Sequence, residues 1–251
     1  MIEIRNIHKG FSGVEILKGI SFTFETGKTN LIIGQSGSGK SVLTKCIVGL
    51  YDVDEGEVLY DGRDMQASDI KEKKEIRKEI GMLFQGSALF DSMTVEENVM
   101  FPLMMYTKMS QEEMLERVNF CLQRVELFDK NHLYPAETSG GMQKRIAIAR
   151  AIALNPRYLF CDEPNSGLDP KTSIVIDNLI KDITEEYNIT TVVITHDMNS
   201  VLEIGENIMF LYHGNNAWVG NKDSIITTDA QEVTEFVYAS KFMRDYKDRM
   251  M

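Results

Sequence analysis

Apolar and polar residues alternate in two stretches near the N-terminus, Ile2 to Ile7 and Ile20 to Phe24. Alternation predicts half-buried strands, because successive side chains of a strand point to opposite faces. A third stretch, Lys28 to Ile33, is almost wholly apolar, which is typical of a strand covered on both faces. Leucine and isoleucine then recur at helical spacing from Ser41 to Leu50. The start of the chain therefore predicts strands followed by a helix.

Two more apolar runs, Tyr158 to Cys161 and Thr191 to Thr195, are short and rich in residues that favour strands. We expect them in one parallel sheet with the earlier apolar strand. The stretch from Glu57 to Met65 contains the dipeptide Asp61-Gly62, which predicts a hairpin. The charged run from Asp69 to Glu79 predicts a solvated helix, and we assign it no function.

Residues 86 to 154 have a different pattern. Methionines gather there, and helical spacing runs from Glu112 to Val125 and from Gly141 to Leu154, where Asn155-Pro156 ends it. We expect a mostly helical lobe inserted into an α/β core. The predicted organisation is a core of residues 1–85 and 156–222 with an antiparallel β subdomain, a helical subdomain of residues 86–155, and a C-terminal helical tail of residues 223–251.

Composition narrows the class of protein. The chain has 251 residues, of which 43% are hydrophobic, and a net charge of −11. Its longest apolar run, Val99 to Tyr106, contains Pro102 and is far shorter than the roughly 20 residues that span a bilayer. The first residues lack a secretory signal, and three widely spaced cysteines predict reduced structural thiols. The negative charge argues against direct contact with nucleic acid or anionic lipid, so membrane attachment would require another protein.

A glycine-rich segment between the predicted buried strand and its helix matches the pattern G-x-x-x-x-G-K-[ST]. In such a loop, backbone N–H groups surround a polyphosphate, Lys40 reaches the β and γ phosphates, and Ser41 holds Mg²⁺. The sequence therefore predicts a nucleotide site. The predicted contacts are Gly34, Gln35, Ser36, Gly37, Ser38, Gly39, Lys40, Ser41 and Val42.

A second anion-binding helix start is predicted at Ser139, Gly140 and Gly141, which open a helical pattern. This start has no phosphate-binding loop of its own. One chain with two such half-sites suggests pairing with a second copy.

Polar residues end the two later apolar strands, Asp162-Glu163 in one case and His196-Asp197 in the other. The carboxyl ends of parallel strands face the ligand crevice, so these side chains should point toward the phosphate loop. We expect Asp162 to hold Mg²⁺ together with Ser41, and Glu163 to accept a proton from an attacking water. The alternative is an exposed strand end without function.

His196 and Gln85 complete the predicted catalytic set with Glu163 and Lys40. His196 is expected to contact the γ-phosphate, although an ordinary strand-end histidine is the alternative. Gln85 follows an apolar stretch where the helical lobe departs, so it can touch Mg²⁺ or water. At this position, Gln85 is expected to transmit changes at the nucleotide to the helical lobe.

The order of these motifs resembles that of an ABC-transporter ATPase over nearly the whole chain. The matching set is the phosphate loop, Gln85, Ser139-Gly140-Gly141, Asp162-Glu163-Pro164, Ser166-Gly167-Leu168-Asp169 and His196. The resemblance implies a head-to-tail dimer with ATP between the phosphate loop of one copy and the Ser139 helix start of the other. It also implies that Asp169 lies at the dimer seam and that Phe11 stacks on adenine, with a core position as the alternative for Phe11.

Finer features are similar to the ATPase of Mla-type phospholipid transporters. They are the segment from Gln85 to Leu103 and the signature helix, in which Thr138 and Met142 depart from the common signature LSGGQ. Met142 in place of glutamine puts in doubt a side-chain hydrogen bond to ribose or phosphate. The resemblance implies a membrane permease, an MCE lipid-binding protein and a small cytosolic regulatory subunit as partners. It also implies a cytoplasmic location on the inner face of the cytoplasmic membrane of a diderm bacterium.

Other functions remain open at this point. The same chain could serve an ABC transporter for another cargo, because cargo does not touch the ATPase. A soluble ABC-type ATPase acting on DNA or ribosomes is disfavoured by the compact length and the net charge of −11. A phosphate-loop kinase would leave the Ser139 helix start and Asp169 unexplained.

Two surfaces carry expectations about partners. We expect a permease to dock near Ala88 to Tyr106, with about half of the apolar residues there filling the core of the lobe instead. The apolar candidates are Leu89, Phe90, Met93, Val99, Phe101, Met104 and Met105. In the tail, Asp229 is expected to cap a helix with apolar positions at Val233, Phe236, Val237 and Phe242. That helix should pack on its own core, with the second copy or a regulatory subunit as alternatives.

Overall fold

The computed structural model describes residues 1–239, and the expectations for Phe242 and Tyr246 lie outside this part of the chain. An antiparallel sheet has the strand order β2-β1-β4-β5. A six-stranded sheet has the order β10-β9-β3-β8-β7-β6 and is parallel except for β10. The strands are β1 (Ile2–Phe11), β2 (Val14–Phe24), β3 (Thr29–Ile33), β4 (Glu55–Tyr60), β5 (Arg63–Asp64), β6 (Ile80–Leu83), β7 (Tyr158–Asp162), β8 (Thr190–Thr195), β9 (Asn207–Tyr212) and β10 (Asn215–Gly220).

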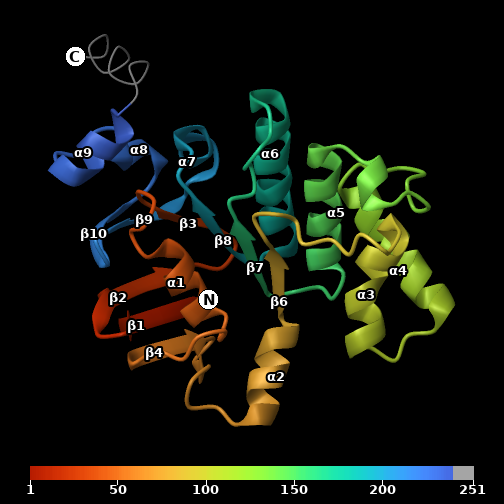
Figure 1. The fold of residues 1–251 in the computed structure, drawn as a ribbon, viewed down its shortest axis with the longest axis horizontal. Coiled ribbons are helices and arrows are strands. Elements are labelled where there is room, and N and C mark those ends of the chain that lie inside the picture. Colours follow the sequence, from red (N-terminus) through yellow and green to blue (C-terminus); the bar gives the residue numbers. More distant parts are fainter. Residues whose placement is uncertain (240–251) are drawn as a thin grey trace.

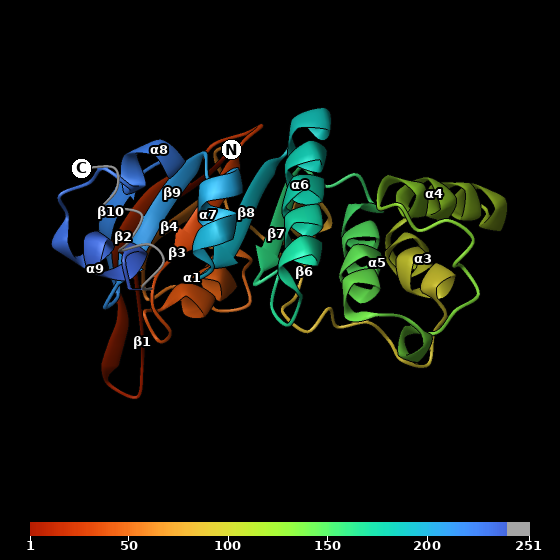
Figure 2. The same ribbon diagram turned by 90° about the horizontal axis from the view of Figure 1, so that it is seen from above.

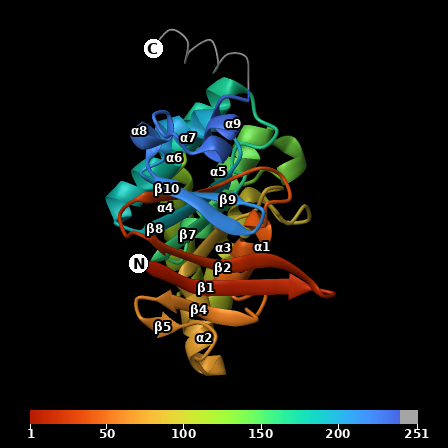
Figure 3. The same cartoon turned by 90° about the vertical axis from the view of Figure 1, so that its left-hand side faces the viewer.

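The six-stranded sheet is covered on both faces, as its apolar strands predict. Every residue of β3 and β8 is buried. Along β3, Leu31 and Ile33 belong to the core on the helical face, whereas Ile32 belongs to the core shared with the antiparallel sheet. Figure 3 shows helices above the central sheet and the antiparallel sheet below it. This sandwich holds the carboxyl ends of the parallel strands at one edge.

The helices occupy three places: one face of the six-stranded sheet, the core shared with the antiparallel sheet, where Leu43 and Ile76 pack, and a separate lobe (Figures 1 and 2). They are α1 (Lys40–Ile47), α2 (Ile70–Lys78), α3 (Val95–Tyr106), α4 (Gln111–Arg124), α5 (Gly140–Ile152), α6 (Pro170–Tyr187), α7 (Met198–Ile204), α8 (Lys222–Ile225) and α9 (Gln231–Val237). Thr94 and Ser110 form capping boxes with Glu97 and Glu113, which fix where α3 and α4 begin. The predicted helical lobe is therefore confirmed, and Pro102 lies within a continuous α3.

The tail differs in one detail from its prediction. Helix α9 exists, but its N-cap is Ala230 and no side chain caps it, so the expected cap by Asp229 is wrong. Thr228 makes the local hydrogen bonds instead, accepting from the N–H of Ala230 at 3.2 Å. Val233 and Val237 are buried, so α9 packs on the core of its own chain.

Candidate functional site

The glycine-rich loop between β3 and α1 is shaped by close backbone approach. Gly34, Gly37 and Gly39 have φ angles of 150°, 79° and 109°, which disfavour other residues. A Cβ on Gly34 would lie 2.3 Å from the carbonyl oxygen of Leu211, so only glycine fits there. Helix α1 begins at Lys40 without a side-chain cap, which leaves its first N–H groups available for an anion.

Lys40 is held against this loop. Its Nζ donates to the carbonyl oxygens of Gly34 at 2.7 Å and Gln35 at 3.0 Å, and the residue is 8% exposed. Burial lowers its pKa, while Glu163 and Asp162 nearby oppose that change. The hydroxyl of Ser38 is buried without a hydrogen-bond partner among the described residues. A lysine and an unpaired hydroxyl inside a loop of N–H groups suit a phosphate group.

The polar ends of β7 and β8 meet beside the loop. Asp162 pairs with Ile194 in the register of the two strands, which brings Glu163 next to His196. The carboxylate of Glu163 lies 2.8 Å from Nδ1 of His196. Glu163 has a φ of 46°, a conformation that costs a non-glycine residue about 1–3 kcal/mol. Strain at this position points to a function, because the surrounding structure must enforce it.

A cleft of about 1070 Å³ joins these groups. It is bounded by the phosphate loop, the strand ends and α9, and Ile16 of β2 also lines it. The predicted residues that line it are Gln35, Ser36, Gly37, Gly39, Lys40, Ser41, Val42, Gln85, Asp162, Glu163 and His196. The predicted residues in this cleft come from four separate segments of the chain.

The donor set in the cleft fits Mg²⁺. The carboxylate of Asp162 makes no hydrogen bond or ion pair within residues 1–239, and burial and the neighbouring Glu163 raise its pKa. A cation would relieve both effects. Ser41 and Gln85, which also line the cleft, add a hydroxyl and an amide oxygen, and hard oxygen ligands of this kind are preferred by Mg²⁺.

Ser139, Gly140 and Asp169 are exposed and stand outside the cleft lining. Ser139 caps its own helix by accepting from the N–H of Met142 at 3.3 Å. Asp169 caps α6 by accepting from the N–H groups of Lys171 and Thr172. A Cβ on Gly140 would lie 3.6 Å from Leu168, so this helix start adjoins the loop before α6. Within one chain, the second anion-binding start and the phosphate loop are separate.

Phe11 was predicted either to stack on adenine or to lie in the core. It is 42% exposed, so the core alternative is wrong. Its ring lies 5.4 Å from the ring of Tyr51, at the end of β1 and outside the cleft lining. Its stacking on adenine stays a prediction.

Two polar side chains near the site were not predicted from the sequence. Lys144 of α5 is 4% exposed and donates to the carbonyl oxygens of Gln85 and, at 3.4 Å, Glu163. It thereby connects the signature helix to the segment after β6 and to the base candidate. Asn165 bonds to two buried side chains on α6 and α7. Neither position has a distinctive sequence pattern, because each side chain acts through contacts that only the fold creates.

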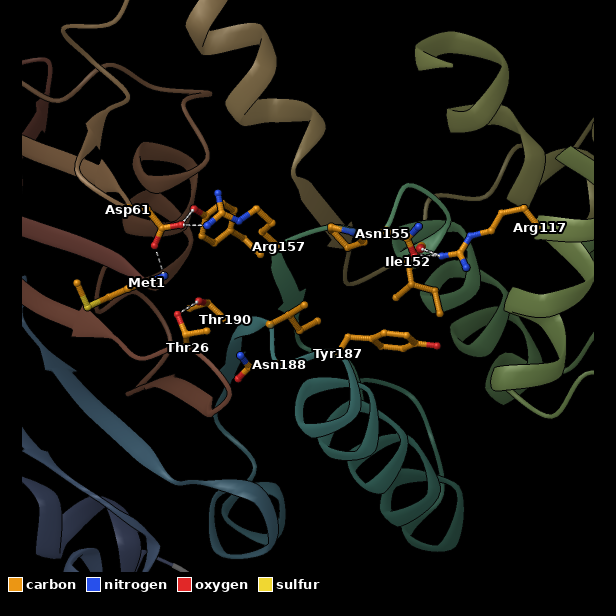
Figure 4. Close-up of a pocket in the computed structure, with 13 residues that line it drawn as sticks. Met1, Thr26, Asp61, Arg117, Ile152, Asn155, Arg157, Tyr187, Asn188 and Thr190 are labelled. Atoms are coloured by element: carbon orange, nitrogen blue, oxygen red, sulfur yellow. Dashed lines mark hydrogen bonds and ion pairs between the residues drawn. The ribbon is translucent and has the colours of Figure 1, made fainter. Parts of the chain in front are cut away.

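A second cavity, of about 500 Å³, lies where β7 and β8 begin, at the opposite edge of the sheet (Figure 4). Most of its polar groups pair with one another, although the buried hydroxyl of Tyr187 has no hydrogen-bond partner among the described residues. Asp61 accepts from the N-terminal ammonium of Met1 and from the hydroxyl of Tyr158, each at 2.6 Å, and also from Arg157. The hydroxyls of Thr26 and Thr190 lie 3.1 Å apart. This cavity therefore lacks the free N–H groups and unpaired carboxylate of the cleft.

The glycine loop, its lysine and the carboxylates at the strand ends define a phosphate-loop nucleotide-binding protein. A model of the ABC transporter family matches residues 17–166. The methionine import ATP-binding protein MetN of Clostridium acetobutylicum is 39% identical over 237 residues, which cover 94% of this chain and 74% of that protein. The "Probable ribonucleotide transport ATP-binding protein mkl" of Mycobacterium leprae is 36% identical, with 94% and 68% covered. The chain belongs to the ABC transporter family and is an ATP-hydrolysing subunit.

Solved structures agree on the fold. The ATP-binding cassette MJ0796, described as a dimer in a post-hydrolysis state bound to ADP and phosphate, has a TM-score of 0.81 and 36% sequence identity, and the match covers 88% of this chain and 99% of that one. The cbiO1 protein of Clostridium perfringens, part of the ABC transporter complex cbiONQ, has a TM-score of 0.85 and 27% identity over 99% of this chain and 98% of that one. The fold is that of an ATP-binding cassette.

Proposed function

We propose that two copies of this chain hydrolyse ATP in sites shared between them and so power phospholipid transport by a membrane permease. The observation that carries the catalytic part is the 2.8 Å contact between Glu163 and His196, at adjacent strand ends in the cleft that Lys40 lines. This contact supports the proposal because it brings a carboxylate and an imidazole together beside the glycine-rich loop.

The residues of the cleft divide the chemistry between them. Lys40 and the loop N–H groups neutralise charge on the phosphates as it develops. Glu163 accepts a proton from the attacking water, and His196 orients that carboxylate and contacts the γ-phosphate. Ser41, Asp162 and Gln85 would hold Mg²⁺, which when bound supplies further charge neutralisation. No covalent intermediate with the protein is needed for this transfer.

The second copy completes each site. The exposed helix start at Ser139 offers N–H groups to an anion, and the relative MJ0796 is described as dimeric. In a head-to-tail dimer, this start would meet nucleotide held by the other copy's phosphate loop, with Asp169 at the seam. ATP bound in such a shared site would hold the two copies together, and its hydrolysis would let them separate.

Mixing two defective variants tests this sharing. Lys40→Ala damages the phosphate-loop half of a site, and Gly140→Asp places a carboxylate at the other half. A mixed dimer contains one site in which both halves are intact, so a mixture should hydrolyse ATP faster than either variant alone. A mixture no faster than its components would contradict the shared site.

The permease is proposed to dock on the apolar surface around α3. Phe90, Met104 and Met105 are 41%, 62% and 61% exposed, whereas Val99 is buried in the lobe. Leu89, Met93 and Phe101 are partly covered, so the expected division between core and surface fits this segment. Among residues 1–239, no helix is long and apolar enough to cross a membrane. Phe90→Asp should therefore release the protein from membranes that contain the permease; retention at the wild-type level would contradict the placement.

Four further parts of the proposal rest on the resemblance of the segment from Gln85 to Leu103 and of the signature helix. They are the phospholipid cargo, the MCE partner, the small regulatory subunit and the location on the inner face of a diderm membrane. The relative MetN is named for methionine import, so methionine is the competing cargo. The ATPase and its permease in vesicles should transfer labelled phospholipid in the presence of ATP. Stimulation of hydrolysis by methionine without lipid transfer would favour the competing cargo.

A further inference from the structure

Asn165 joins three elements that surround the base candidate. It lies in the loop between β7 and α6, two residues after Glu163. Its amide Nδ2 donates to the carboxylate of Asp177 on α6 at 2.8 Å and lies 2.9 Å from the hydroxyl of Ser200 on α7. Asp177 and Ser200 are 2% and 1% exposed. One partly buried side chain, that of Asn165, therefore connects the loop to buried groups on two helices.

The buried carboxylate of Asp177 is unfavourable for the stability of the folded protein. It forms no ion pair within the described part of the chain, and the surrounding groups that face it do not offset its charge. Its pKa is raised to about 6, chiefly by burial; the hydrogen bonds from Asn165 and Ser200 lower it, whereas Asp197, which caps α7, and Glu203 on α7 contribute to the rise. The buried thiol of Cys161 on β7 also faces it. A buried carboxylate that costs stability is retained more readily where its hydrogen bonds hold something in place.

The tied elements carry the reactive groups. The loop that contains Asn165 begins at the strained Glu163 and ends at Asp169, which caps α6. Helix α7 follows His196 directly, with Ser200 four residues after that histidine. The Glu163 and His196 side chains therefore belong to two segments that the pairing of β7 with β8 brings together and that the contacts of Asn165 with Asp177 and Ser200 also connect.

We propose that Asn165, Asp177 and Ser200 are positioning residues that hold the loop after β7 against α7, so that the Glu163 carboxylate meets His196. This inference rests on the roles proposed above for Glu163 and His196. The three side chains are not among the residues that line the cleft, so we expect no direct contact with substrate. They act by restricting the loop, and they should therefore affect the rate of hydrolysis more than the binding of ATP.

Asp177→Ala is the direct test. It removes the acceptor that Asn165 needs, so kcat for ATP hydrolysis should fall about tenfold while KM for ATP changes less than about twofold, because small misplacements of reacting groups cost rate steeply. Asp177→Asn keeps an acceptor oxygen and should recover most of the rate. Asn165→Ala removes the donor of the same hydrogen bond. The double variant Asn165→Ala/Asp177→Ala should have a kcat only slightly lower than that of Asp177→Ala, since the two residues act together.

Thr184→Val provides the matched control on the same helix. Thr184 is buried and donates to the carbonyl oxygen of Ile180 at 2.7 Å, far along α6 from the loop. It should lose stability as Asp177→Ala does, but kcat should stay near wild type at temperatures where both variants remain folded by circular dichroism. An equal loss of kcat in Thr184→Val, or an unchanged kcat in Asp177→Ala, overturns the positioning role.

Glu163→Gln distinguishes a failure of this inference from a failure of the proposed function on which it rests. If Glu163→Gln is inactive and Asp177→Ala is fully active, the positioning role fails and the base survives. If Glu163→Gln keeps normal turnover, the proposed base fails whatever the result at Asp177. If Asp177→Asn is as slow as Asp177→Ala, the acceptor oxygen is not what positions the loop, and the inference is overturned.

Discussion

Two helix starts are proposed to bind anions, and their surroundings differ. Helix α1 begins inside the cleft with no side-chain cap and with Lys40 buried in the loop that precedes it. Helix α5 begins at an exposed surface, and Ser139 caps its own first turn. One start is built to surround an anion, whereas the other offers N–H groups on an open face. In the proposed dimer, this difference would let each chain contribute one half to each of two shared sites.

The loop from Glu163 to Asp169 lies between the two starts. Its first residue faces the cleft of α1, and Leu168 near its end adjoins Gly140 of α5. Lys144 adds a second connection, from α5 to the backbone of Gln85 and Glu163. Chemistry at one start is therefore linked to the surface around the other, which is what coupling hydrolysis to dimer opening requires.

The largest expected effect comes from Glu163→Gln, which removes the proposed base and leaves both helix starts unchanged. Glu163→Gln should lower ATP turnover at least about 100-fold, because general-base catalysis contributes on that scale. ATP should still bind, so the variant should remain a dimer in ATP. Phosphate release and size-exclusion chromatography measure the two properties. Near-normal turnover would exclude Glu163 as the base.

Lys40→Ala should break the α1 start. Each charge-assisted hydrogen bond to phosphate is worth about 1.5–3 kcal/mol, so ATP affinity should fall by roughly 10- to 100-fold. Titration with a fluorescent ATP analogue measures this. Lys45→Ala on the same helix is the control, since Lys45 stands outside the cleft lining. Equal affinity in Lys40→Ala and wild type would contradict the phosphate-loop assignment.

Gly140→Asp should break the α5 start and leave the α1 start intact. A Cβ there meets Leu168 at an ordinary contact distance of 3.6 Å, so the fold should tolerate the change. The new carboxylate repels phosphate at the dimer seam, and ATP-dependent dimerisation of a Glu163→Gln background should weaken about tenfold, or roughly 1.4 kcal/mol. ATP affinity of the single chain should not change.

Gly140→Ala serves as the size control for that result, because it adds the Cβ without the charge. Analytical ultracentrifugation with ATP compares the two variants. If Gly140→Asp dimerises as well as Gly140→Ala, the exposed helix start does not meet nucleotide across the seam.

Much of this arrangement follows from local sequence, and some of it does not. The phosphate loop, the apolar strands and the polar strand ends were predictable because chain neighbours determine them. Asn165, Asp177 and Ser200 were not, since they meet only after α6 and α7 pack together. The cap of α9 was wrong for a related reason, because a nearby hydroxyl, Thr228, bonds to the backbone where Asp229 was expected to do so.

The last expected effect concerns the loop that lies between the two starts, and it appears in stability rather than in activity. Asp177 has a pKa of about 6 in the folded protein, above its ordinary 3.8, because burial disfavours the charged form. The folded state thus binds the proton more tightly than the unfolded state. The resulting destabilisation is absent below about pH 4, grows as the pH rises, and is complete above about pH 6.

Asp177→Asn removes this titration while keeping an acceptor for Asn165. The wild type should lose at most about 3 kcal/mol of unfolding free energy between pH 4 and pH 7 through this one group, and the variant should not. For a chain of this size, the melting temperature of Asp177→Asn should exceed that of wild type by roughly 5 °C at pH 7 and should equal it near pH 4. Thermal unfolding measured across this pH range tests the expectation. Parallel curves for the two proteins would mean that Asp177 carries no buried charge, and its bond to Asn165 would then have to be explained without one.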